Sequence, residues 1–128
     1  MSGKASLAAL LGSLSPQRRP GSFVFVPVDE PPVDLEVLAS VVEPEGLSLV
    51  VTREDAERLG LTYDFVAAWI TLRVHSTLDA VGLTAAVSTA LAEAGISCNV
   101  VAGYHHDHLL VPLDRAEDAL IVLRGLSA

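Results

Sequence analysis

Residues 69–112 read WITLRVHSTLDAVGLTAAVSTALAEAGISCNVVAGYHHDHLLVP, and the hydrophobic period changes along this stretch. Residues 67–75 alternate at every second position, which predicts a strand with one buried face. Residues 81–94 repeat apolar side chains at helical spacing and stop at Gly95, which predicts a helix with a left-handed end. The strand is expected to bury Ala68, Ile70, Leu72 and Val74 and to place Trp69, Thr71, Arg73 and His75 on its other face.

The rest of the second half predicts a hairpin followed by a helix. Residues 97–102 and 108–113 are mostly apolar and flank a polar turn at 103–107, so we expect two antiparallel strands. Asp114 is expected to cap a final helix that ends at Gly125.

The first half predicts shorter elements. Apolar spacing and turn residues predict a helix at 5–14, strands at 22–28, 37–42 and 47–51, and a helix at 53–59. Thr52 precedes the second helix and its hydroxyl is expected to cap it, and Gly60 is expected to end it. The strands at 37–42 and 47–51 flank turn residues and therefore predict a hairpin.

The order of these elements predicts the fold class. From residue 67 they follow the first five elements of a βαββαβ ferredoxin-like unit, and the sixth, a strand, is missing. We therefore expect an α+β protein in which an N-terminal strand completes the C-terminal sheet. The predicted architecture is two interlocked sandwiches with antiparallel sheets, a degenerate unit at 1–63 and a second unit at 64–128.

Composition excludes several classes of partner. The 128 residues carry a formal net charge of −8, and Lys4 is the only lysine, so neither nucleic acid nor an anionic membrane is an expected partner. The sequence contains no apolar run of the roughly 20 residues that a membrane span needs, and no signal-peptide pattern. Cys98 is the single cysteine, which excludes an internal disulfide and favours the cytoplasm, and we expect it to be a small buried residue.

The stretch 69–112 resembles the ACT family of small-molecule-binding regulatory domains, in particular the short stand-alone tandem-ACT proteins of bacteria. The resemblance rests on Val74, on Gly82-Leu83 at the start of a helix and on the AGIS turn at 94–97. Residues 35–61, LEVLASVVEPEGLSLVVTREDAERLGL, resemble the companion half of the same proteins. The resemblance implies a ligand sensor, commonly for amino acids, with the ligand bound between two ACT units.

One place in the sequence suits such a ligand. The loop at 76–79 leads into the helix near Gly82, where unpaired backbone N–H groups and the helix dipole favour a carboxylate. The polar start of the next strand, with Ser97 and Asn99, offers partners for an ammonium group. The expected ligand-binding residues are Ser76, Thr77, Asp79, Gly82, Leu83, Ile96, Ser97 and Asn99.

A group of histidines is the other feature of the sequence that could carry a function. His106 and His108 alternate onto one side of a strand, and with His75 they could bind zinc or nickel, which makes a metal-responsive switch the second alternative function. A polar cluster at a hairpin tip is more often a solvated turn. No phosphate-binding glycine loop or hydrolase motif occurs, so neither catalysis nor a cofactor is expected. A ligand-free dimerisation module is the first alternative to a sensor. Both the sensor and the dimerisation module are expected to be a homodimer or higher homo-oligomer. Strands 67–75 and 97–102 are expected to build the shared sheet, because little Lys or Pro protects their edges.

Overall fold

The computed structural model describes residues 6–74 and 81–127, and its centre is one antiparallel sheet with the strand order β2-β3-β1-β4-β6-β5. The strands are β1 (Pro16–Val28), β2 (Ala39–Glu43), β3 (Gly46–Thr52), β4 (Val66–Leu72), β5 (Asn99–Ala102) and β6 (Asp107–Pro112). The helices are α1 (Leu7–Gly12), α2 (Arg53–Arg58), α3 (Leu83–Glu93) and α4 (Ala116–Leu126), with a 3-10 turn η1 (Leu113–Arg115) before α4. The predicted α+β class and antiparallel pairing are confirmed.

Strand β1 joins the two halves of the sheet. Its residues 23–28 pair with β3, and its residues 16–19 pair with β4. The predicted interlocking is therefore confirmed, because an N-terminal strand lies beside β4 where the sixth element was missing. The predicted start at residue 22 is wrong: the polar residues 17–19 belong to the strand although they lack apolar alternation. Gly21 has φ 100° and lies in a bulge between Arg19 and Phe23, which explains why the strand continues in a new register.

Two overlapping four-stranded sets share β1 and β4. The sets β2-β3-β1-β4 and β1-β4-β6-β5 both have the order of a ferredoxin-like sheet. The second set carries α3 between its first two strands, whereas residues 29–38 of the first set form a connection without a helix or strand. This proline-containing connection is the degenerate feature of the first set. The division of the chain at residue 63 stays a prediction.

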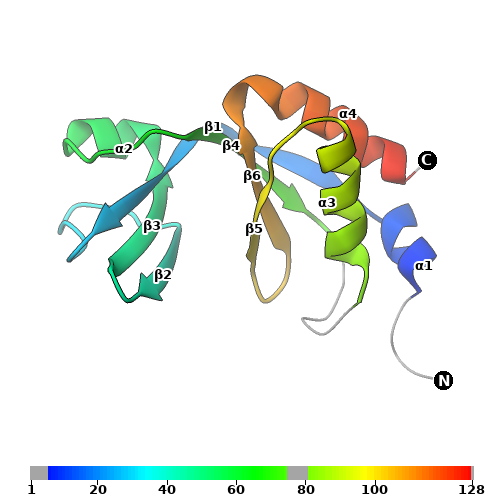
Figure 1. Ribbon diagram of the computed structural model, residues 1–128, viewed down its shortest axis with the longest axis horizontal. Coiled ribbons are helices and arrows are strands. Elements are labelled where there is room, and N and C mark those ends of the chain that lie inside the picture. Colours follow the sequence, from blue (N-terminus) through cyan, green and yellow to red (C-terminus); the bar gives the residue numbers. More distant parts are fainter. Residues whose placement is uncertain (1–5, 75–80, 128) are drawn as a thin grey trace.

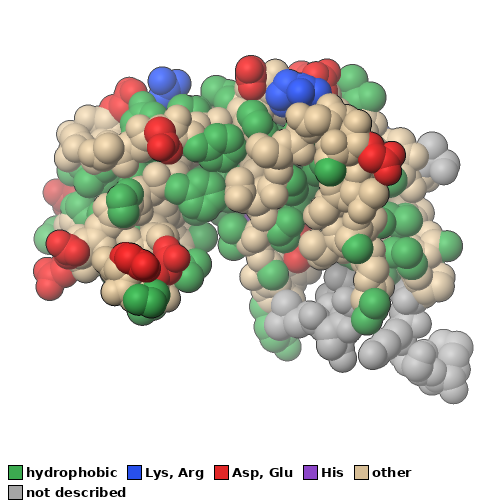
Figure 2. Space-filling view, in the orientation of Figure 1, with side chains coloured by type: hydrophobic (Ala, Val, Ile, Leu, Met, Phe, Trp, Pro, Cys, Tyr) green, Lys and Arg blue, Asp and Glu red, His purple; other side chains and the backbone are tan. Residues whose placement is uncertain are grey.

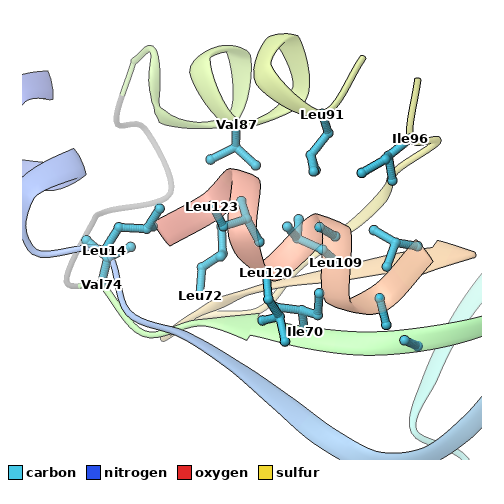
Figure 3. Packing of buried hydrophobic residues seen from close by; sticks show 14 of the residues in the cluster. Leu14, Ile70, Leu72, Val74, Val87, Leu91, Ile96, Leu109, Leu120 and Leu123 are labelled. Atoms are coloured by element: carbon cyan, nitrogen blue, oxygen red, sulfur yellow. The ribbon is translucent and has the colours of Figure 1, made fainter. Parts of the chain in front are cut away.

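All four helices cover one face of the sheet (Figure 1). Under α1, α3 and α4 lies the largest hydrophobic cluster, which includes the predicted face of β4. Figure 3 shows Ile70 and Leu72 of β4 and Leu109 of β6 in one cluster with side chains of the two helices, which are Val87 and Leu91 of α3 and Leu120 and Leu123 of α4. A smaller cluster of Val24, Val26, Leu49, Val51 and Ala56 lies under α2.

The helix-free face has a hydrophobic cluster of its own. The sheet bends into an arch, so its two wings approach each other on the side opposite the helices (Figure 1). Phe23 and Trp69 of the central strands pack there with Val50 of one wing and Leu110 of the other. Figure 2 shows the resulting notch in the lower outline of the molecule, with hydrophobic side chains gathered along it. We call this surface the helix-free face.

Most predicted helix ends are confirmed, and the two that concern α4 are wrong. Thr52 accepts from the backbone N–H of Asp55, and Gly60 and Gly95 have φ 68° and 73° after α2 and α3. Asp114 lies inside η1 instead of capping α4, because the chain enters a 3-10 turn directly after Pro112. Gly125 lies within α4, which continues to Leu126.

Candidate functional site

The predicted ligand site begins at the first turn of α3. Gly82 precedes this helix with φ 101°, and within the described residues no side chain caps its N–H groups. The helices α1 and α2 differ, because the hydroxyls of Ser6 and Thr52 accept from their first turns. Among the described residues, the first N–H groups of α3 thus have no side-chain partner, and such groups can bind an anion. The predicted loop residues Ser76, Thr77 and Asp79 lie outside the described residues.

The remaining predicted residues are not gathered around Gly82. The side chains of Leu83 and Ile96 are each 3% exposed and belong to the core under the helices. Ser97 and Asn99 are exposed, but they follow the other end of α3. An 11-residue helix is about 16 Å long, so one chain does not bring these polar residues to the start of α3.

Gly82 also has a structural reason to be glycine. A Cβ atom there would lie 3.3 Å from Cδ2 of Leu7 in α1, and the positive φ already disfavours other residues. The first turn of α3 is thus held in place by a hydrophobic contact with α1. The predicted role of Gly82 in ligand approach and this packing role are compatible.

Cys98, which lies between Ser97 and Asn99, is less buried than the sequence predicts. Its side chain packs partly buried against the core under the helices, and burial raises the pKa of its thiol. A raised pKa keeps the sulfur protonated at neutral pH and lowers its reactivity.

On the helix-free face, His108 forms a small polar network. The indole N–H of Trp69 donates to Thr71 Oγ1 at 3.1 Å and to His108 Nδ1 at 3.3 Å, and the Thr71 hydroxyl lies 3.0 Å from the same nitrogen. Because an indole N–H only donates, Nδ1 is the acceptor and the ring carries its proton on Nε2. Burial lowers the pKa of His108, and nearby His106 lowers this pKa further. The network therefore favours neutral His108.

Within the described residues, His106 and His108 are not joined by a third metal-ligating side chain. Among residues 6–74 and 81–127, no group of three or more His, Cys, Asp or Glu side chains is arranged to hold a metal ion. His108 already uses Nδ1 within the network, and His75, the expected third ligand, lies outside the described residues. Gly103 packs against His108, since a Cβ atom at position 103 would lie 3.1 Å from His108 Nε2.

A cleft of about 430 Å³ opens beside this network. Its lining includes Arg19 of β1, Thr71 of β4 and Arg73, together with His106 of the hairpin turn. The guanidinium of Arg19 lies 5.4 Å from the centre of the Trp69 ring, and Arg73 donates to Gln17 Oε1 at 2.9 Å. Sequence reasoning missed this cleft because residues 16–20 were not recognised as a strand. The signal available was the alternation of Gln17 and Arg19, which places both on one face.

Comparison with protein families identifies the chain. One family model described as an ACT domain matches residues 2–68, and a second, also described as an ACT domain, matches residues 65–125. The chain belongs to the ACT domain family. The expected resemblance is confirmed, and both halves of this ACT protein contribute to it.

Solved structures share the fold of this ACT protein. A Vibrio cholerae protein of unknown function, described as a possible transport protein, is 46% identical, with a TM-score of 0.87 over 95% of this chain and 96% of that one. An Agrobacterium tumefaciens protein has a TM-score of 0.70 at 19% identity, over 89% of each chain. The ligand-free regulatory subunit of aspartate kinase from Thermus thermophilus has a TM-score of 0.62 at 9% identity, over 89% of this chain and 98% of that one. A search of curated proteins found no match.

The helices of the ACT protein are short. None of those in the described part of the chain has the length and apolar character needed to cross a membrane.

Proposed function

We propose that the protein is a non-enzymatic regulatory sensor that binds an amino acid and transmits its presence through a homodimer in the cytoplasm. Membership of the ACT family across residues 2–125 supports a regulatory ligand-binding role. The observation that carries the proposal is the first turn of α3, where Gly82 leaves backbone N–H groups without a side-chain cap among the described residues. A ligand carboxylate is the natural partner for such groups.

A second copy of the chain would complete the site. Strand β5 is an edge of the sheet and contains no charged residue or proline, so it can pair with another β5. In an antiparallel pair, the start of one strand lies beside the end of the other. The end of β5 leads back toward the start of α3, so the partner's Ser97 and the partner's Asn99 would approach the end where Gly82 lies. These polar groups would hold the ammonium or side chain of the ligand, with Ser76, Thr77 and Asp79 contributing from the loop before α3.

The predicted dimer surface needs one correction. Strand β4, which covers most of the predicted strand 67–75, pairs with β1 on one side and β6 on the other. It therefore has no free edge, and the expectation that it builds a shared sheet is wrong. The edges of the sheet are β5 and β2.

A paired set of variants tests the proposal. Val100→Lys places a charge on the edge strand β5, and Val42→Lys places the same charge on the opposite edge strand β2, where Val42 is 84% exposed. We expect the first variant to be monomeric by light scattering and to lose stabilisation by amino acids in a thermal-shift screen. The second should keep both properties. A ligand at a hundred times its Kd adds about 2.7 kcal/mol to the free energy of unfolding, which such a screen detects.

Asn99→Ala gives the residue-specific arm, with Ser40→Ala on β2 as its control. Both side chains are exposed, so the free energy of unfolding should change little in either variant. Only Asn99→Ala should weaken amino-acid binding. A dimer that no amino acid stabilises would contradict the sensor and leave the ligand-free dimerisation module as the function.

A further inference from the structure

The cleft on the helix-free face gathers two arginines that form no ion pair within the described part of the chain. The chain is acidic, with 16 Asp and Glu against 8 Lys and Arg, so most arginines have a carboxylate close by. Four arginines form ion pairs with carboxylates, and these are Arg18, Arg53, Arg58 and Arg115. Within the described residues, Arg19, Arg73 and Arg124 form none, and the first two line the same cleft. Two guanidinium groups that share one cleft and have no carboxylate partner among residues 6–74 and 81–127 favour an anionic ligand.

The arrangement of the two arginines leaves their donors available. Arg19 Cζ lies 5.5 and 5.4 Å from the centres of the Phe23 and Trp69 rings, so the guanidinium makes a cation–π contact with both. A guanidinium has five N–H donors, and these contacts leave donors available for a ligand. Arg73 uses Nη1 to bind Gln17 Oε1, and its other donors can bind a ligand.

The spacing of the arginines favours two acidic groups on one ligand. Arg19 pairs in register with Trp69, and the backbone of Arg73 lies about 14 Å from that of Trp69 at the rise of an extended strand. The bond of Arg73 to Gln17 brings its guanidinium back toward Arg19, which is two residues from Gln17. The register pair Gln17 and Thr71 lies between the two arginines and adds an amide and a hydroxyl to the lining of the cleft. A ligand with a carboxylate at each end can contact both guanidinium groups.

His106 adds a polar group that needs a partner. Its Nδ1 is buried and has no hydrogen-bond partner among the described residues, although the side chain lines the cleft. A buried polar atom without a partner is unfavourable, and a ligand in the cleft can supply one. The acidic neighbour Asp107 does not compete, because it pairs in register with Leu72 and so belongs to the helix-covered face.

We propose that this cleft binds a small organic dicarboxylate, with one carboxylate at Arg19 and the other at Arg73. Its volume of about 430 Å³ lies within the range of about 300–1,000 Å³ typical of small-molecule sites. The site is separate from the amino-acid site proposed above, because Gly82 belongs to the helix layer and the cleft belongs to the opposite face of the sheet. The dicarboxylate site does not rest on the proposed amino-acid sensor.

Isothermal titration calorimetry of the full chain with succinate, at constant ionic strength, tests the site. Arg19→Gln and Arg73→Gln should each raise the Kd of succinate about tenfold or more, because each removes a charged hydrogen-bond donor. Arg124→Gln is the matched control: it removes the same charge from α4, away from the cleft, and should leave the Kd unchanged. Acetate, which has one carboxylate, should bind more weakly than succinate.

Three outcomes would overturn the proposal. They are the absence of succinate binding at millimolar concentration, an equal Kd in both cleft variants and the parent, and binding of inorganic phosphate as tight as that of succinate. A melting curve first establishes that each variant is folded, and Arg73→Gln serves alone if Arg19→Gln disturbs the aromatic rings beneath it. Succinate lacks an ammonium group, so its binding does not depend on the amino-acid site, and failure at one site leaves the other testable.

Discussion

The two wings of the sheet differ in how they are covered. The wing of β5 and β6 lies under α3 and α4, with α1 beside them, and contains the largest hydrophobic cluster. The wing of β2 and β3 has only the six-residue α2, and a connection without a helix at 29–38 replaces the helix that α3 supplies to the other wing. Its edge strand leaves Val41 and Val42 60% and 84% exposed.

The difference shows how a ferredoxin-like set of strands can lose a helix and remain in a folded chain. Strands β1 and β4 belong to both four-stranded sets, so the well-covered wing stabilises two of the four strands of the other. The bulged strand β1 and the arch of the sheet also bring the two wings together around Phe23 and Trp69. The sharing of β1 and β4 therefore compensates for the smaller hydrophobic cluster under α2.

Removing the shared strand should have the largest effect. A fragment of residues 64–128 lacks β1 and the buried residues Leu10 and Leu14, so β4 has a free edge and the main core is open. We expect this fragment not to fold as a stable monomer, as measured by circular dichroism and light scattering. A cooperative melt of a monomeric fragment would show that the C-terminal unit is independent and that the sharing is dispensable.

A matched pair of leucines compares the two cores directly. Leu91 of α3 and Leu49 of β3 are 0% and 1% exposed, one in each hydrophobic cluster on the helix-covered face. Leu91→Ala should lower the free energy of unfolding by about 4 kcal/mol, near the upper part of the range for this substitution, because its surroundings are fully packed. Leu49→Ala should cost about 2 to 3 kcal/mol, because the thinner cover can relax into the space. Urea unfolding of both variants measures the difference, and an equal loss would show that the two cores are packed equally well.

Two glycines at helix ends test the same contrast on a smaller scale. Gly60 has φ 68° and open space where a Cβ would lie, so Gly60→Ala should cost about 1 kcal/mol from backbone strain alone. Gly82→Ala should cost more than this, because its φ of 101° is less suitable and the new Cβ meets Leu7. Thermal unfolding measures both costs. An equal cost would mean that α1 moves freely away from α3.

The smallest expected effect is a pH dependence from His108. Its pKa is lowered in the folded protein, so the unfolded chain binds a proton more readily as the pH falls below the ordinary value of 6.5. The contribution to stability is therefore present above that value and is lost as the pH falls toward the lowered pKa. His108→Gln, whose amide oxygen can still accept from Trp69, should remove this part of the pH dependence. Urea unfolding at pH 7.5 and 5.5 measures this dependence. If the free energy of unfolding changes by the same amount between the two pH values in parent and variant, the assignment to His108 is contradicted.

Much of the fold was predictable from local sequence. The alternation of β4, the helical spacing of α3 with Gly95 after it, and the Thr52 cap of α2 are short-range patterns, and the structure confirms each of them. Short-range patterns succeed because a strand or helix that buries one face must repeat apolar residues at its own period. The ACT resemblance of the stretch 69–112 rests on the same elements.

The extent of β1, the edges of the sheet and the cleft were decided only by the tertiary structure. Residues 17–19 show no apolar alternation because their neighbours are supplied by distant parts of the chain: Glu117 pairs with Arg18, and Trp69 lies under Arg19. Whether a strand is central or at an edge depends likewise on pairing with segments far along the sequence, which is why the free edge predicted for strand 67–75 is wrong. The cleft joins Arg19 to Arg73 and His106 across three separate segments, and only the folding of β1 against β4 brings them to one face.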